Sequence, residues 1–124
     1  DGYIVFGKRS AKLACLPGHW HCVPAGHLHS VQSRDVLEQE LREELDCGWE
    51  VVRSARLVAV IDTGMEQGDK PELAFWLRIS VSASDLQSRF LGAEDRAEHD
   101  GLIFIRAAAH GERLGEANVA VGLP

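Results

Sequence analysis

The sequence predicts one mixed α/β domain. Its 124 residues are enough to bury a single core but too few for two. The hydrophobic fraction of 45% and the charged fraction of 26% are typical of soluble globular chains. Apolar periodicity and turn residues indicate the order strands, helix, strands, short helix and strand, and this order favours a mixed α/β domain.

The first half of the chain contains two predicted strands and the strongest predicted helix. Residues 2–9 and 19–23 have the composition of strands, and a Pro-Ala-Gly turn ends the second. The opening directly in a strand is consistent with native sequence preceding residue 1. A helix is predicted over 34–46, with Ser33 as its N-cap and Gly48 placed to end it.

The second half alternates β-type stretches with shorter helical ones. Ser84, with Gln87 three residues on, predicts a capping box that opens a short helix. A polar loop over 62–71 and an acidic loop over 92–100 separate the elements. The predicted elements are β-type stretches at 51–52 and 57–61, a central strand at 73–81, a short helix to about 91, a buried strand at 102–105, and an Ala-rich helix broken by Gly111 and Gly115.

Charge and composition exclude several classes of function. The formal net charge is -6 and no basic patch is present, which excludes binding to nucleic-acid phosphates. No apolar run approaches the roughly 18 residues of a membrane span, and no signal segment opens the chain. Three cysteines at no disulfide spacing favour a reducing cytoplasm, where we expect them to act as small core residues. Phosphates would need a metal ion, or a few well-placed Arg and Lys residues, to approach this acidic chain.

Three carboxylates share one face of the predicted helix. Glu40, Glu43 and Glu44 are spaced i, i+3 and i+4, and at 100° per residue they fit within about 100° of arc. Like charges at this spacing repel, and a hard divalent cation with oxygen ligands would turn the repulsion into coordination. A solvated acidic face is the alternative interpretation of such a run. An adjacent stripe of three leucines would seat the helix on a sheet: Leu37, Leu41 and Leu45.

The segment around these carboxylates resembles a known family. Pro24-Ala25-Gly26-His27 and Glu40-Leu41-Arg42-Glu43-Glu44 resemble the entry and the E-U-x-E-E core of the Nudix box, G-x5-E-x7-R-E-U-x-E-E-x-G-U, where U is bulky and apolar. Gly7-Lys8-Arg9 resembles the G-x-R strand before the box, and Leu102–Ile105 resembles a late strand of the family. The resemblance spans most of the chain. It implies one Nudix domain over 1–124, with a mixed β-sheet sandwiched between helices.

The box departs from the family pattern at four places. Glu40 follows Gly26 by 14 positions, one fewer than the pattern requires. The first box glutamate has no counterpart, because Val31 or Gln32 lies there. Gln39 replaces the box arginine and Asp46 the box glycine. We interpret these changes as a relaxed scaffold that keeps its metal site, and reduced or altered activity stays open.

The resemblance assigns the metal ligands. Glu40 and Glu44 would bind Mg²⁺ directly, with Mn²⁺ as a substitute. Glu43 would be a direct or water-mediated ligand, and the backbone carbonyl of Gly26 would complete the site. Glu43 and Glu44 would also belong to the catalytic set, in which water attacks a diphosphate phosphorus.

The same resemblance places a base or further ligand in the loop before the late strand. Glu98 is the first candidate for this catalytic role, and Glu94 and Asp95 are alternatives. Arg9 is a candidate for binding a substrate phosphate, although a solvated strand end fits it equally. His27 is a second candidate substrate contact, because the family often has histidine there.

Two other side-chain patterns resemble those of metal-binding or base-stacking residues. Histidines at 19, 21, 27 and 29 lie near cysteines, but the spacing of a structural zinc site is absent. Trp20 could stack on a base, and a place in the core is the alternative.

The function expected is therefore that of a metal-dependent Nudix pyrophosphohydrolase in the cytoplasm. Its substrate would be a small molecule, a nucleoside diphosphate linked to another moiety, with a nucleotide sugar as the first candidate. Other nucleoside diphosphate derivatives and damaged nucleoside triphosphates are alternatives. A homodimer would be common for the family. Two rival hypotheses are a Nudix-fold nucleotide-binding or regulatory module without turnover, and an unrelated α/β interaction domain with a solvated Glu-rich helix.

Overall fold

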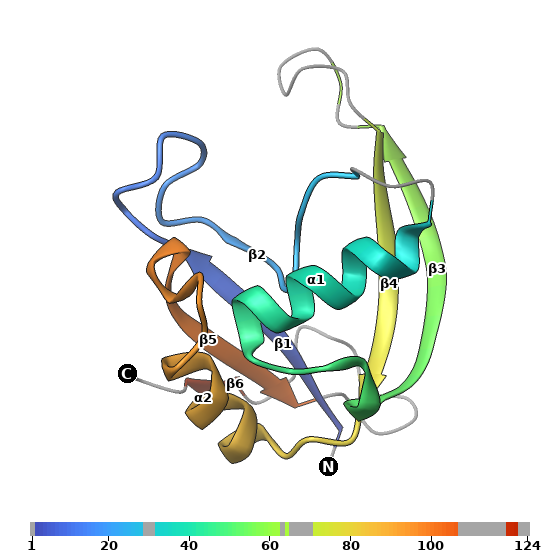
Figure 1. The fold of residues 1–124 in the computed structure, drawn as a ribbon. Helices are drawn as coiled ribbons and strands as arrows, with labels where there is room; N and C mark the ends of the chain where they lie inside the picture. Colours follow the sequence, from blue (N-terminus) through green and yellow to red (C-terminus); the bar gives the residue numbers. More distant parts are fainter. Residues whose placement is uncertain (1, 29–31, 63, 65–70, 107–118, 122–124) are drawn as a thin grey trace. The chain divides into compact units, whose positions relative to one another are not determined.

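The computed structural model describes the chain except for residues 1, 29–31, 63, 65–70, 107–118 and 122–124. The described part is mixed α+β, with two antiparallel sheets and two α-helices (Figure 1). The chain divides into two compact units, Asp1–Gly48 with Ser82–Pro124, and Trp49–Val81. The mixed α/β class predicted from the sequence is therefore confirmed.

The first unit contains a four-stranded sheet in the order β2-β1-β5-β6. Its strands are β1 (Tyr3–Arg9), β2 (Trp20–Cys22), β5 (His99–Arg106) and β6 (Val119–Val121). Gly7 of β1 lies opposite His21 on one side and Leu102 on the other. This register makes β1 an inner strand, flanked by β2 and β5. The strand pairings among the described residues are antiparallel, whereas the resemblance implied a mixed sheet.

Helices α1 (Ser33–Leu45) and α2 (Ala83–Leu91) complete the core of the first unit. Figure 1 shows both helices in front of this sheet. Along β5, Leu102 and Phe104 are buried while the residues between and after them are only half-buried, so one face of the strand carries the core. The predicted leucine stripe of α1 is confirmed at Leu41 and Leu45, which are buried, and Leu37 is half-buried. Burial of each such side chain stabilises the fold by about 1.5–3 kcal/mol.

The ends of α1 differ from those predicted. Its N-cap is Gln32, one residue before the predicted Ser33. The helix ends at Leu45 because Asp46 adopts the left-handed conformation, with φ of 51°. Asp tolerates this conformation better than most residues, so the predicted Gly48 is not the terminator. The Asp46 N–H donates to the Arg42 carbonyl at 3.0 Å, the bond of an αL-type helix end, and the Cys47 N–H donates to the Leu41 carbonyl at 3.2 Å.

The N-cap of α2 lies two residues earlier than predicted. Ser82 is the N-cap, and its hydroxyl accepts a hydrogen bond from the Asp85 N–H at 3.1 Å. The predicted cap, Ser84, lies inside the helix. Both serines have a polar residue three positions on, so the local pattern alone did not separate them.

The second unit is a β-hairpin preceded by a 3-10 turn, η1 (Trp49–Val51). Strand β3 (Val52–Asp62) is continuous through the two β-type stretches predicted separately, and it pairs with β4 (Pro71–Ile79). The Ser80 N–H donates to the Val51 carbonyl at 2.8 Å at the open end of the hairpin. The strand predicted at 73–81 is present as β4, but the prediction that it is a central strand is wrong, since β4 belongs to a two-stranded sheet.

The end of the chain was predicted as an Ala-rich helix. Most of that segment, 107–118, lies outside the described residues, and Val119–Val121 forms strand β6 instead. Neither described helix is long and apolar enough to cross a membrane.

The cap of α2 gives a direct test of this fold. Ser82→Ala should lower the free energy of unfolding by about 1 kcal/mol, because the Asp85 N–H loses its side-chain acceptor. Ser84→Ala, the matched control, should change it much less. Urea unfolding of both variants measures the difference, and equal losses would contradict the assignment of the cap.

Candidate metal and catalytic site

The carboxyl group of Glu44 is buried against the turn that follows β2. Its side chain is 2% exposed, and its Oε2 accepts a hydrogen bond from the Ala25 N–H at 3.2 Å. This contact joins the last turn of α1 to the Pro-Ala-Gly segment, 19 residues earlier in the chain. A glutamate on a merely solvated helix face would not be sealed from water in this way.

Glu40 lies against the next residue of the same segment. A Cβ atom built at Gly26 would meet the carboxylate of Glu40 and would lie 2.6 Å from its Cγ. A Cβ at this position would displace the Glu40 side chain, so glycine is what permits the close approach. The structure brings Glu40 and Glu44 together on the Ala25–Gly26 side of the helix, as the sequence predicts.

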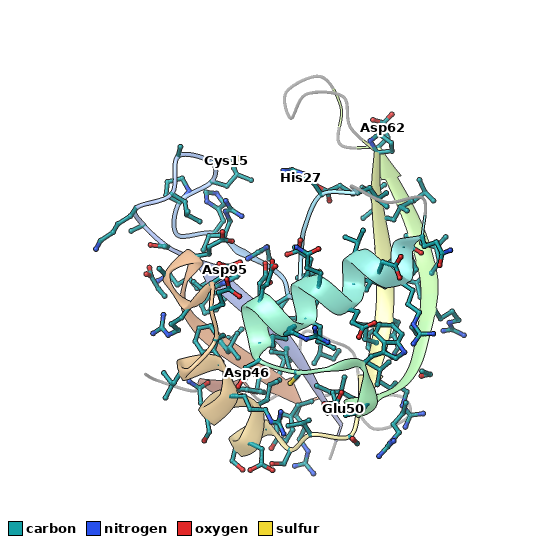
Figure 2. The ribbon with its side chains drawn as sticks, in the orientation of Figure 1. Cys15, His27, Asp46, Glu50, Asp62 and Asp95 are labelled. Atoms are coloured by element: carbon teal, nitrogen blue, oxygen red, sulfur yellow. The ribbon has the colours of Figure 1, made fainter. Side chains whose placement is uncertain are left out.

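Backbone hydrogen bonds join the acidic loop before β5 to α1 and to the residue after β1. Its Asp95 N–H donates to the backbone carbonyl of Glu43 at 2.9 Å, on α1. The Glu98 carbonyl, at the end of η3 (Arg96–Glu98), accepts from the Ser10 N–H at 2.8 Å, just beyond β1. Figure 2 labels Asp95 in this loop, beside α1. The loop carrying the candidate base is thus tied to the helix carrying the candidate ligands.

Burial and the neighbouring acidic groups shift the pKa of the Glu44 carboxyl. Burial, together with the negative charges of Glu40, Glu98 and Asp95, raises the pKa of its carboxyl to about 8, while the hydrogen bond from Ala25 opposes the rise. Three other acidic groups therefore lie close enough to Glu44 to disfavour its charge. Strong shifts caused by burial and by specific charged neighbours are typical of functional sites.

Glu43 is placed differently from the other two helix carboxylates. Its Oε1 accepts a hydrogen bond at 2.8 Å from the amide of Gln39, the residue that replaces the box arginine. Both residues line a polar groove together with Glu94. The sequence predicted one shared site for three glutamates, and the structure pairs two of them at Gly26 and ties the third to Gln39.

The donor chemistry at Gly26 suits a hard cation. Mg²⁺ prefers oxygen ligands, and the carboxylates of Glu40 and Glu44 with the backbone carbonyl of Gly26 supply them. As the side chains stand, no group of three or more His, Cys, Asp or Glu in the described part of the chain is arranged to hold a metal ion. A cation here would therefore be held by two carboxylates and other oxygen atoms, unless Glu43 turns away from Gln39.

The two predicted substrate contacts occupy different settings. The Arg9 Nε donates to the Cys15 carbonyl at 2.9 Å, so this guanidinium spans the loop between β1 and β2. His27, the residue after Gly26, is exposed, and Figure 2 shows it in the segment leading towards α1. Both positions are compatible with contact to a substrate phosphate. Arg9 also stabilises the loop through its bond to Cys15.

Several predictions about core residues are wrong. Cys47 is buried as expected, but Cys15 and Cys22 are exposed. Trp20 is 51% exposed and lies on the outer face of the sheet, with the Lys8 ammonium 5.9 Å from the centre of its ring. Cys15 lies in the loop between β1 and β2, and Trp20 and Cys22 lie on the short strand β2, so these side chains stay at the surface.

A buried histidine pair was not predicted. His99 is 1% exposed, and its Nε2 lies 2.8 Å from the Nε2 of His21, 78 residues away in the sequence. Burial, together with the neighbouring His21 ring and the positive charges of Arg9 and Arg96, lowers the pKa of His99 to about 4. Burial likewise lowers the pKa of His21, so both rings are neutral at pH 7. No spacing rule links residues so far apart, and His29, from the weighed zinc pattern, lies outside the described residues.

Comparison with known proteins gave no match, either to a protein-family model or to a curated protein sequence.

The ionisation of Glu44 predicts how stability depends on pH without divalent cations. Its unfolded carboxyl ionises near 4.5 and its folded carboxyl near 8, so the free energy of unfolding should fall as pH rises between these values. The slope from this group is at most about 1.4 kcal/mol per pH unit. Glu44→Gln removes that slope, and urea unfolding in EDTA between about pH 5 and about pH 8 should show a flatter profile for the variant. Equal slopes would contradict the buried carboxyl.

Proposed function

We propose that this chain is a metal-dependent hydrolase of the Nudix type. Its reaction is cleavage of the diphosphate bond in a nucleoside diphosphate linked to another moiety, with a nucleotide sugar as the first candidate substrate. One observation carries the proposal. A buried glutamate of the Nudix-like helix, Glu44, lies with Glu40 against Ala25–Gly26 and feels the charges of the acidic loop.

The burial of Glu44 argues against a simple solvated face. Packing acidic side chains together without compensation costs free energy, because burial disfavours each charge and neighbouring charges repel. A bound divalent cation would offset both costs. An interaction domain with a merely acidic helix has no need for a glutamate that is 2% exposed.

The chain's own groups can be given roles in this reaction. Glu40 and Glu44, with the Gly26 carbonyl, would hold Mg²⁺ or Mn²⁺, and Glu43 would join them directly or through water. Once bound, the cation would neutralise phosphate charge and lower the pKa of water. Glu98 has an exposed side chain and a backbone fixed by Ser10, and it would accept the proton of the attacking water.

Substrate contacts are assigned to the segments around this site. His27 follows Gly26 directly and is exposed, so its ring would meet a substrate phosphate or ribose. Arg9 would contribute positive charge from the end of β1, where its Nε bond to Cys15 limits the directions in which the guanidinium can reach.

A second candidate function is a nucleotide-binding module of the same type without turnover. The hydrogen bond between Gln39 and Glu43 favours it, because this bond holds one of the three helix carboxylates away from Gly26. The absence of the first Nudix-box glutamate also favours the binding module. Such a module would keep ligand binding and lose phosphate release.

Hydrolysis is tested by phosphorus NMR with Mg²⁺ and a panel of nucleoside diphosphate derivatives. Glu40→Gln and Glu44→Gln should each reduce kcat by about 100-fold or more, because each removes a charged ligand. Glu38→Gln is the matched control from the same helix, since Glu38 pairs with Arg42 at 3.3 Å, and it should retain activity.

The outcomes separate the candidate functions. Thermal stabilisation by a nucleotide without phosphate release would favour the binding module. No turnover and no stabilisation by Mg²⁺ or any nucleotide would contradict both functions.

Gly26 provides a further test of the cation site. Gly26→Ala should weaken Mn²⁺ binding by roughly tenfold, because the new Cβ displaces the Glu40 carboxylate. Stability should change little, since the displaced group is the far end of a flexible side chain. Gly92→Ala is the control, because a Cβ there would meet its nearest neighbour, the Arg89 carbonyl, at an ordinary 3.6 Å. Titration calorimetry with Mn²⁺ measures both, and unchanged affinity in Gly26→Ala would count against this site.

A further inference from the structure

A sealed cluster of side chains lies where the acidic loop joins β5. Its centre is the His99 ring, whose Nε2 is 2.8 Å from the Nε2 of His21 on β2. The two rings are nearly parallel, at 5°, and the Phe90 ring of α2 meets His99 edge-on with centres 6.3 Å apart. The His99 side chain is therefore fixed from β2, which lies beyond β1 in the sheet, and from a helix.

The backbone around His99 is built to accept this ring. A Cβ atom at Gly7 would lie 2.6 Å from the Cδ2 of His99, so only glycine on β1 leaves room for the imidazole. The Arg96 guanidinium donates to the His99 carbonyl and stands over the Phe90 ring, 4.6 Å from its centre. Each contact restrains the residue that immediately follows Glu98.

We infer that the His21–His99 pair is a positioning device for the acidic loop, holding Glu98 and Asp95 opposite Glu44. This inference rests on the proposed function, in which Glu98 accepts a proton. His99 directly follows Glu98 in the chain, and the pair acts on Glu98 through the backbone. One imidazole donates its N–H and the other accepts, so the bond is directional and sets where β5 begins. The Ser10–Glu98 and Asp95–Glu43 bonds then carry that position to the site.

The test compares substitutions of His21 that do and do not reach the His99 ring. His21→Leu removes the hydrogen bond and leaves a buried ring nitrogen without its partner. His21→Gln keeps a polar group at about the position of Nε2, whereas the shorter His21→Asn does not. His19→Leu is the matched control, since this neighbouring histidine is exposed and its ring hydrogen-bonds the Pro17 carbonyl at 3.1 Å.

Two readouts are measured on each variant. Amide hydrogen exchange at Ser10 and Asp95 reports the loop's attachment whether or not the protein turns over substrate, and the Asp85 amide on α2 is the internal reference. In His21→Leu and His21→Asn we expect at least tenfold faster exchange at Ser10 and Asp95. We also expect at least a tenfold loss of kcat with KM within about twofold. His21→Gln should restore both, and His19→Leu should change neither.

The outcomes distinguish this inference from the proposed function. Unchanged exchange at Ser10 and Asp95 in His21→Leu and His21→Asn overturns the positioning role, as does faster exchange with unchanged kcat. A wild-type protein that hydrolyses nothing, but whose variants show the faster exchange and its rescue by Gln, supports the anchoring of the loop and overturns the hydrolase. If His21→Leu does not fold, the contrast between Gln and Asn at the same position decides.

Discussion

The hydrogen bond from the Ala25 N–H to the buried Glu44 carboxyl is the contact on which the candidate site depends. It fixes the distance between the turn after β2 and the last turn of α1, and so it determines what can lie between them. Glycine at position 26 then admits the Glu40 side chain to the same space. A neutral side chain in place of Glu44 would satisfy the Ala25 N–H without any strain from repulsion. The carboxyl is therefore costly for folding, and such costs are typical of residues kept for function.

Backbone hydrogen bonds bring three separate segments of the chain to this place. The turn after β2 meets α1 through Ala25, and the acidic loop meets α1 through the Asp95 N–H. The same loop is tied to the end of β1 through Ser10, and the His21–His99 pair holds its C-terminal end. The fixed backbone limits how far the attached carboxylates can move. The arrangement can therefore hold groups that repel one another without a large rearrangement when charge is neutralised.

A hydrogen bond between Gln39 and Glu43 affects the charge on one face of α1. Where the family pattern has arginine, a neutral amide donates to the neighbouring carboxylate, so the charge of Glu43 is hydrogen-bonded but not neutralised. An arginine would bind the same carboxylate more strongly and would place a positive charge beside the site. The substitution leaves the helix more acidic, which favours attraction of a cation but weakens the hold on Glu43. Both candidate functions follow from this balance, and they differ in whether Glu43 is released towards Gly26.

The sequence by itself determined the helix, its acidic face and its leucine stripe, because residues three and four positions apart always meet on a helix. The resemblance to the Nudix box led us to expect Gly26 beside the helix carboxylates, and the structure places the Glu40 side chain against Gly26. Tertiary structure decided the burial of Glu44 and the pairing of His21 with His99. It also decided which serine caps α2 and how β3 and β4 pair. Spacing along the chain says nothing about burial or about partners dozens of residues away, since both depend on how strands and helices pack.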